Sequence, residues 1–384
     1  MENSYDYIIA GSGLAGLSLL HRILLEGSLS EKKILVIDSD QKTKNDRTWC
    51  FWEKGKGLFE PIVHHTWDTL SFFAPGISET FQMESYSYKM ILGEDFYSYV
   101  LEAAAKKANV KFLTTKIQKI RSAGNLAYID TAEGSFEAQY VFNSTGLFFP
   151  KMDEENTLLQ HFLGWKIKAK ESVFDPKKAT LMDFTLDQKH GTTFMYVLPT
   201  NPQEALVEYT LFTERVLERE EYEQALKKYI QEDLGIKEYE ITHDEFGVIP
   251  MSLAKFKRFE GKEKRIINLG TAGGYTKAST GYTFAFVQKH LEKVVANLRQ
   301  GKSPAVPKSL SDRTYDWYDR TLLDVLLSKK LTGREIFSQL FTKVPPESVM
   351  AFLANESSQI EEFKIRHSVP ILAFATSGIR QILQ

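Results

Sequence analysis

The segment YDYIIAGSGLAG, residues 5–16, constrains the fold more than any other part of the chain. Its apolar start is typical of a short buried strand, and residues 14–25 continue with apolar side chains at helical spacing. The glycines between them suit a dinucleotide-binding turn. Gly11 permits the turn, Gly13 lets the backbone approach a pyrophosphate, and Gly16 lets the helix pack closely on the strand. We therefore predict a strand, a glycine turn and a helix whose first N–H groups face an anion.

The sequence around this motif supports a dinucleotide site. The helix begins at Leu14 and Ala15, so their backbone belongs to the predicted site. Residues 33–38, KILVID, are typical of a second buried strand that ends in Asp38, roughly 20 residues beyond the glycines, where a carboxylate can hold ribose hydroxyls. The alternative is an ordinary loop in which Asp38 caps a turn or helix. The flanking strands and the spacing of the acid favour the dinucleotide site.

Composition excludes several classes of partner. Lysine and arginine (48) nearly balance aspartate and glutamate (50), and the formal net charge of −2 predicts that nucleic acid is not a partner. Cys50 is the only cysteine, which excludes an internal disulfide and a cysteine-rich metal site and favours a reducing compartment. We expect no metal site and a cytoplasmic protein.

The two ends of the chain bear on membrane association. The first strand is expected to begin within about five residues, so we expect no signal peptide. No apolar run reaches the ~18 residues that a spanning helix needs, so we expect a soluble or peripheral protein. Residues 303–384 are helical in pattern and end in an apolar run at 369–383. This run either packs on the core or contacts a membrane surface.

Two further segments are candidates for cofactor contact. In DRTWCFW, residues 46–52, Asp46 and Arg47 stand beside bulky rings. We expect an unusual loop there, which either anchors itself in the core or lies against a flat cofactor ring. The strand expected at 136–142 leads into Asn-Ser-Thr-Gly, and Gly146 is either a second nucleotide contact or a plain turn residue.

An antiparallel sheet is predicted next, because apolar strands alternate with turn residues. These strands are expected at 161–167, 179–184, 193–198 and 205–212. In the last one, period two places Glu208 on one face with Leu206 and Phe212. If that face is buried, desolvation raises the pKa of Glu208 and makes it a proton donor; if it faces water, Glu208 is a solvated strand residue.

A second glycine turn follows the sheet. The apolar stretch at 246–251 is expected to end as a strand at Pro250. Strand 265–269 then leads into a glycine-rich turn and a helix from about 282 to 301. The turn contains Gly270, Gly273 and Gly274. The two glycine turns, at 11–16 and 270–274, could therefore contact the same cofactor.

The whole pattern predicts an α/β protein with a Rossmann-type FAD/NAD(P)-binding domain, an inserted antiparallel-sheet substrate domain and a helical C-terminal region. We expect the first domain at 1–75, 94–150 and 262–302, the second at 76–93 and 151–261, and the third at 303–384.

Several motifs together resemble the lycopene cyclases, and among them the bacterial lycopene beta-cyclases. The resemblance covers roughly residues 5 to 300. It is carried by GSGLAG at 11–16, DRTWCFW at 46–52, FLGW at 162–165, MYVLP and LVEYT at 195–210, GVIPM at 247–251 and GTAGGYTKASTGY at 270–282.

The resemblance implies a function. In that family reduced FAD assists ring closure of lycopene without net redox change, and NADPH only keeps the flavin reduced. The family's essential carboxylate corresponds to Glu208, which would protonate a terminal double bond; the resulting cation cyclises and loses a ring proton to give a beta-ionone ring, as in gamma- and beta-carotene. Glu208, Asp46 and the flavin are all candidates for the final base. Gly270-Thr271 stands where many flavoproteins carry Gly-Asp, so this flavin contact must differ.

The resemblance also implies a partner and a place in the cell. Lycopene is apolar, so a peripheral enzyme would take it from the cytoplasmic membrane. One alternative is a redox flavoprotein on the same scaffold, such as an isoprenoid reductase or aromatic hydroxylase, which would consume NADPH stoichiometrically. Another is a flavin-binding or membrane-peripheral protein without catalysis.

Overall fold

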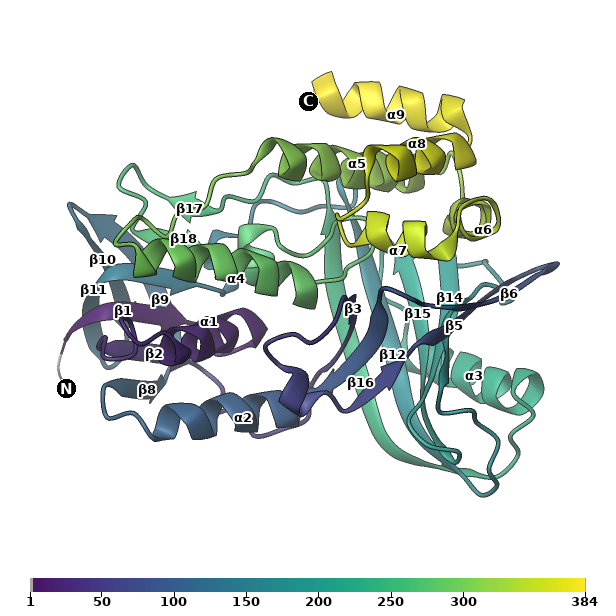
Figure 1. Cartoon of the computed structure of the whole chain (residues 1–384), viewed down its shortest axis with the longest axis horizontal. Coiled ribbons are helices and arrows are strands. Elements are labelled where there is room, and N and C mark those ends of the chain that lie inside the picture. Colours follow the sequence, from purple (N-terminus) through teal and green to yellow (C-terminus); the bar gives the residue numbers. More distant parts are fainter. Residues whose placement is uncertain (1–2, 384) are drawn as a thin grey trace.

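A computed structural model describes residues 3–383. A sheet with a parallel centre, here called the parallel sheet, contains the predicted first strand (Figure 1). Its order is β17 (Phe259–Glu260), β18 (Ile266–Asn268), β11 (Gly134–Asn143), β1 (Ser4–Ala10), β2 (Ile34–Asp38) and β8 (Val110–Thr114). Strand β1 lies parallel to both β11 and β2. The carboxyl ends of these central strands therefore meet at one edge, where ligands bind in such folds.

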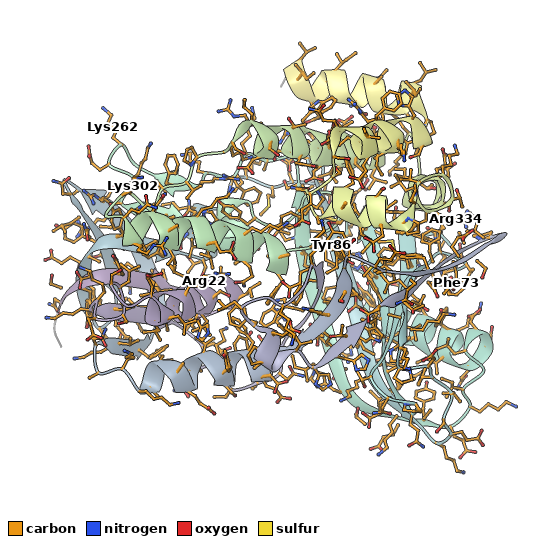
Figure 2. The ribbon with its side chains drawn as sticks, viewed as in Figure 1. Arg22, Phe73, Tyr86, Lys262, Lys302 and Arg334 are labelled. Carbon is orange, nitrogen blue, oxygen red and sulfur yellow. The ribbon has the colours of Figure 1, made fainter. Side chains whose placement is uncertain are left out.

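Helices cover one face of the parallel sheet. They are α1 (Leu14–Leu25), α2 (Gly93–Ala105) and α4 (Phe284–Arg299). Their apolar stripes share one core with the alternate residues Tyr7 and Ile9 of β1. Arg22, labelled in Figure 2, extends from α1 to within 3.3 Å of Glu292 on α4. The opposite face packs against β9 (Ile117–Ala123) and β10 (Leu126–Thr131). The predicted Rossmann-type architecture is confirmed.

The aromatic segment at 46–52 is largely a strand, so the prediction of a loop was wrong there. Residues Thr48–Glu53 form β3, which pairs antiparallel with β7 (Ser87–Leu92), and β7 also pairs with β4 (His65–Trp67). Bulky side chains suit a pleated strand whose faces are both covered. Phe51 stacks on Phe284 of α4 with ring centroids 4.1 Å apart.

A long twisted sheet, here called the cavity sheet, stands beside the nucleotide fold (Figure 1). Its order is β16 (Tyr239–Ser252), β12 (Thr157–Ala169), β15 (Glu204–Thr213), β14 (Thr192–Pro199), β13 (Lys178–Asp183), β5 (Thr69–Ala74) and β6 (Ile77–Gln82). Neighbours are antiparallel except for the parallel pair β13 and β5. Because β5 and β6 pair here, this sheet draws on a segment before α2 as well as on the main insertion. The domain boundaries themselves stay a prediction.

The two faces of the cavity sheet differ. Val207 and Tyr209 share a core with helix α3 (Arg219–Lys228), which continues as a π-helical turn at Tyr229–Asp233. Leu206 and Phe212 belong to the core on the opposite face. The predicted alternation along β15 is therefore confirmed, and Glu208 points to the side away from α3.

We had expected the strand at 246–251 to end at Pro250. Instead, β16 continues to Ser252. Pro250 lies opposite Leu159 of β12. Strand β16 is at the edge of the sheet, where alternate N–H groups have no neighbouring strand, so a proline can be accommodated without loss of pairing.

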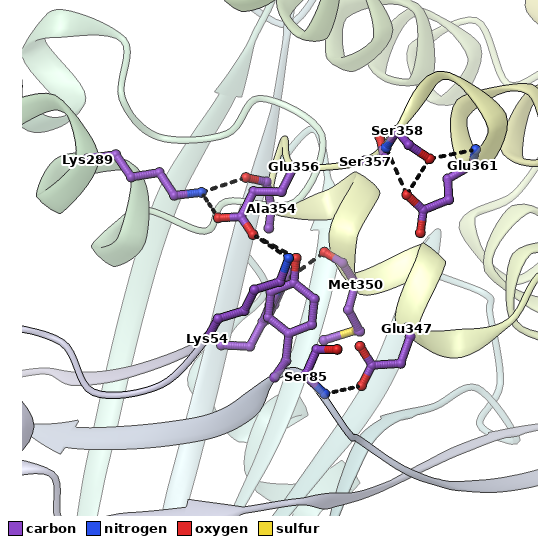
Figure 3. Close-up of polar contacts among 12 residues, drawn as sticks. Lys54, Ser85, Lys289, Glu347, Met350, Ala354, Glu356, Ser357, Ser358 and Glu361 are labelled. Carbon is purple, nitrogen blue, oxygen red and sulfur yellow. Dashed lines mark hydrogen bonds and ion pairs between the residues drawn. The ribbon is translucent and has the colours of Figure 1, made fainter.

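The C-terminal region is helical, as predicted. It comprises α5 (Leu310–Leu327), α6 (Gly333–Lys343), α7 (Pro346–Leu353), α8 (Gln359–Ser368) and α9 (Ile371–Leu383). Figure 3 shows how the α7 segment is attached: Glu347 accepts a hydrogen bond from the Ser85 N–H (3.1 Å), and Glu356 pairs with Lys289 of α4 (2.6 Å). Of the helices within residues 3–383, none is both long and apolar enough to cross a bilayer.

Candidate active site

A cavity of about 430 Å³ lies between the first glycine turn and the cavity sheet. From the nucleotide fold it is lined by Gly13, Leu14, Asp46, Arg47, Thr271 and the segment 280–284. From the cavity sheet it is lined by Gln160, Phe162, Tyr196, Leu198, Leu206, Glu208, Glu245 and the segment 247–250. The structure thus brings both predicted glycine-rich turns and the predicted carboxylate to one space.

The first glycine turn is tight on the protein side and open on the cavity side. Gly11 has φ +97°, and a Cβ there would lie 2.4 Å from Ser144 Oγ. A Cβ on Gly16 would lie 2.0 Å from the carbonyl oxygen of Gly11, so the helix sits directly on the strand. A Cβ on Gly13 would meet no atom within 4 Å. The tight turn at Gly11 and the close packing at Gly16 are as predicted. The backbone at Gly13 is open to a ligand, and its contact with a pyrophosphate stays a prediction.

The predicted acids lie beside this turn. Asp38 ends β2, and its Oδ2 accepts hydrogen bonds from Ser12 N (2.6 Å) and Ser12 Oγ (3.0 Å). Asp46 lines the cavity and accepts a hydrogen bond from the Tyr97 hydroxyl (2.9 Å). Arg47 also lines the cavity but is largely exposed. Asp38 does not line the cavity, so its ribose contact stays a prediction.

The second glycine turn touches the first. It is a short 3-10 helix at Gly270–Gly273, and a Cβ on Gly270 would lie 3.0 Å from the Cβ of Ala15 on α1. Gly274 ends this turn with φ +73°. In contrast, Gly146 is exposed after β11 and does not line the cavity.

A row of residues crosses the cavity sheet at Glu208. Tyr196 of β14 is opposite Glu208 of β15, and Glu208 is opposite Gly164 of β12. Gly164 is in turn opposite Glu245 of β16. Directly opposed residues project from the same face of a sheet. Gly164 has no side chain, and Leu206 Cδ1 and the Glu208 side chain lie within 3.5 Å of where its Cβ would be. The floor of the cavity therefore carries two carboxylates on either side of Gly164.

The surroundings of Glu208 favour its neutral form. The residue is half-buried between buried neighbours in β15, and it lines the cavity. Burial raises the pKa of Glu208 to about 8. The hydroxyl of Thr210, which donates to Glu208 Oε1 at 2.8 Å, opposes this rise, and the Glu245 carboxylate adds to it. At neutral pH Glu208 can therefore hold a proton inside the cavity.

We did not predict Glu245 as a site residue from the sequence. It is 6% exposed, and its Oε1 accepts a hydrogen bond from the Thr48 N–H at 3.0 Å. Burial raises the pKa of Glu245, against the hydrogen bonds from Thr48. The expected strand began one residue later, at 246. The alternation of Glu245 with Gly247 and Ile249, which both line the cavity, could have indicated it.

Aromatic side chains form much of the remaining wall. The hydroxyls of Tyr196 and Tyr282 lie 3.3 Å apart, and Trp52 packs edge-on against Tyr282 at 4.5 Å. Burial raises the pKa of Tyr282 to about 12, so this phenol stays neutral. Neutral rings present a negative quadrupole face, which stabilises a nearby cation without a water molecule.

The parallel sheet, the paired glycine turns and the long sheet over the cavity define a protein of the FAD-dependent flavoprotein fold. The structure of a geranylgeranyl bacteriochlorophyll reductase-like protein from Thermoplasma acidophilum matches 96% of this chain and 100% of its own, with a TM-score of 0.66 and 13% identity. Aklavinone-11 hydroxylase, solved in a ternary complex with FAD and aklavinone, matches 78% of this chain and 63% of its own, with a TM-score of 0.52 and 15% identity. At such identities the likeness shows the fold alone.

Within this class, the chain belongs to the lycopene cyclase family, because residues 6–378 match the family described as "Lycopene cyclase protein". It is therefore an enzyme of carotenoid biosynthesis. The lycopene beta-cyclase of Pantoea ananas is 23% identical over 397 residues, which cover 97% of both chains. The resemblance inferred from the motifs is confirmed.

Proposed function

We propose that this protein is a lycopene beta-cyclase that closes the psi ends of lycopene by acid catalysis without net redox change. The single observation that carries this proposal is Glu208, a carboxyl group that lines a cavity with aromatic rings in its wall and whose pKa desolvation raises to about 8. An unactivated alkene is protonated only by a neutral acid in a site that excludes water.

The proposed steps use residues of the row across the cavity sheet. The Glu208 carboxyl gives its proton to a terminal double bond, and the next double bond captures the tertiary cation to close a six-membered ring. The aromatic wall stabilises the positive charge. A ring proton then leaves, and its electron pair forms the new double bond. We propose Glu245 as the acceptor, because it lies in the same row of the cavity sheet as Glu208 and projects from the same face.

We propose FAD as the resident cofactor, with NADPH as its reductant. FAD fits this site because the backbone at Gly13 is open to a ligand and α1 packs closely on β1 at Gly16. The second glycine turn also lies beside the first, where Gly270 is next to Ala15. A flavin in its reduced, anionic form supplies negative charge that stabilises a cation.

The proposal is tested by supplying lycopene in vesicles to the FAD-loaded protein under anaerobic reducing conditions. A product of unchanged mass with cyclised ends is expected, and NADPH consumption should stop once the flavin is reduced. NADPH oxidised in a fixed ratio to product, with a change in product mass, would instead establish a redox enzyme on the same scaffold.

The pH dependence of cyclisation provides a second test. Because the acid form of Glu208 is active, the rate should fall as the pH rises through about 8. Thr210→Val removes a hydrogen bond that favours the carboxylate, so the fall should move to higher pH. Glu245→Gln removes a neighbouring negative charge, so the fall in rate should move to lower pH. If Glu245 also accepts the ring proton, the rate at low pH should drop about 100-fold as well. Rate profiles of both variants that coincide with that of the parent would contradict this assignment.

We further propose that the protein contacts the cytoplasmic membrane through its C-terminal helices, where it would take up lycopene. Helix α9 forms the outer surface beside α5 and α8 in Figure 1. Large apolar side chains are exposed on α9 at Ile371, Leu372, Ile379, Ile382 and Leu383, and on α8 at Ile360 and Phe363. Clustered exposed apolar groups of this kind mark interaction surfaces.

Leu372, which is 83% exposed, is the natural site for a test of this contact. Leu372→Ser should weaken binding to phospholipid vesicles about 10-fold in flotation assays, because burial of a leucine contributes roughly 1.5–3 kcal/mol. Leu25→Ser is the matched control, since Leu25 is also exposed but lies at the end of α1. Equal binding by both variants and the parent would exclude α9 as the contact surface.

A further inference from the structure

A second cavity, of about 350 Å³, lies on the other side of the second glycine turn. It is bounded by the segment after β16, by α4 and by the start of α5. Pro250 and Thr271 line both this cavity and the active-site cavity, so the two spaces are neighbours. No step of the proposed cyclisation uses the second cavity.

Positive charge dominates the second cavity. Seven lysine and arginine side chains line it, against three aspartates. Each aspartate already has a cationic partner: Asp312 pairs with Arg258 (3.1 Å), Asp316 with Lys308 (3.1 Å) and Asp319 with Lys277 (2.7 Å). Lys289 is paired as well, with Glu356 outside the lining. Positive charges still outnumber negative ones at the cavity, and an anion would neutralise this excess.

A stack of three side chains forms part of the lining. The rings of Tyr275 and His290 are stacked with centroids 3.8 Å apart, and the guanidinium of Arg258 lies 4.9 Å from the Tyr275 ring. Tyr275 is 8% and His290 is 5% exposed. Within the described part of the chain, Tyr275 Oη, His290 Nδ1 and Arg258 Nε have no hydrogen-bond partner. Buried polar atoms without partners are rare, and their clustering at one cavity indicates a missing ligand.

Two lysines on α4 differ in how they are held. Lys289 is engaged: Figure 3 shows it between the Glu356 carboxylate (2.6 Å) and the Ala354 carbonyl oxygen (2.9 Å). Lys293, one helical turn further along, also lines the cavity. Its charge helps to lower the pKa of Asp312, but within residues 3–383 it makes no hydrogen bond and no ion pair as short as 4.0 Å. Its ammonium group is therefore available to a ligand.

From the charge excess, the stack with its unpartnered atoms and the available ammonium of Lys293, we propose that the second cavity is a binding site for a phosphate-bearing anion. Arginine and lysine bind phosphate oxygens through charge-assisted hydrogen bonds. The phosphate could belong to a soluble molecule or to a lipid headgroup. The exposed Leu310, beside the lining residues Ser309 and Ser311, places apolar surface at the margin of the cavity. This site does not depend on the cyclase assignment.

The test uses protein saturated with FAD, so that the first glycine turn is occupied, and measures binding of inorganic pyrophosphate by calorimetry at low salt. Lys293→Met should weaken binding about 10-fold and Tyr275→Phe about 3-fold. Lys262→Met is the matched control, because Lys262 is an exposed lysine on the loop between β17 and β18 (Figure 2) and should leave binding unchanged.

Vesicle flotation distinguishes the two sources of phosphate. Vesicles of phosphatidylcholine with phosphatidylglycerol are compared with vesicles of phosphatidylcholine alone. Preferential binding to the anionic vesicles that Lys293→Met reduces and Lys262→Met does not would assign the site to a lipid headgroup. Pyrophosphate binding that depends on Lys293, without this vesicle preference, would assign it to a soluble phosphate. Absence of both, or affinities that neither Lys293→Met nor Tyr275→Phe changes, would overturn the proposal.

Discussion

Replacement of Glu208 by glutamine should abolish the cyclisation of lycopene. Glutamine matches the size of glutamate and can still accept the Thr210 hydroxyl hydrogen bond, but its amide cannot give up a proton to an alkene. General acid catalysis contributes about 10²–10⁴-fold, and an alkene has no alternative route at neutral pH, so we expect a loss at the upper end of this range. The rate is measured from the absorption and mass of the extracted pigment.

Glu204→Gln is the matched control for this experiment. Glu204 begins the same strand, but its carboxylate pairs with Lys166 at 3.7 Å and does not line the cavity. This variant should cyclise lycopene at the parental rate. Both variants should bind FAD and unfold at the parental temperature, so that a loss confined to Glu208→Gln reports chemistry. Full activity of Glu208→Gln would show that another group is the acid.

Replacement of Gly16 by alanine should destabilise the nucleotide fold and abolish FAD binding. The added methyl group would lie 2.0 Å from the Gly11 carbonyl oxygen and 3.0 Å from Ile9 Cγ2. Backbone cannot yield as a flexible side chain can, so α1 must move away from β1. We expect a loss of about 3 kcal/mol or more in the free energy of unfolding, at the upper end of overpacking effects. Thermal unfolding and the flavin content of the purified protein measure the two effects.

Substitutions at two other glycines distinguish the effect of steric strain from the effect of a lost ligand contact. Gly27→Ala adds a methyl group that meets no atom within 4 Å, lies outside the turn and should change neither stability nor flavin content. Gly13→Ala also meets no protein atom, but its methyl group enters the space predicted for the pyrophosphate. It should fold normally and bind FAD more weakly. Normal flavin binding by Gly16→Ala would refute the close-packing role of this residue.

Local patterns predicted much of the framework, because their physical causes lie within a few residues. The helix expected at 14–25 is α1, and most of the expected strands match strands of the two sheets to within a few residues at their ends. The exception is β16, which begins at Tyr239 and not at 246. The errors have tertiary causes. Pairing with β7 makes a strand of Thr48–Glu53, and the edge position of β16 accommodates Pro250.

The sequence by itself determined that the chain would form a glycine turn for an anion, a second sheet and an alternating strand that places Glu208 on one of two faces. Only the tertiary structure decided which face is buried and what else it carries. Glu208 and Glu245 lie in one row on either side of Gly164. This row forms because two antiparallel pairings, β15 with β12 and β12 with β16, align residues that are far apart in the chain. The stack of Arg258, Tyr275 and His290 likewise joins a loop, a turn and a helix. Such pairings follow from hydrogen-bond register and packing between distant segments, and no local period encodes them.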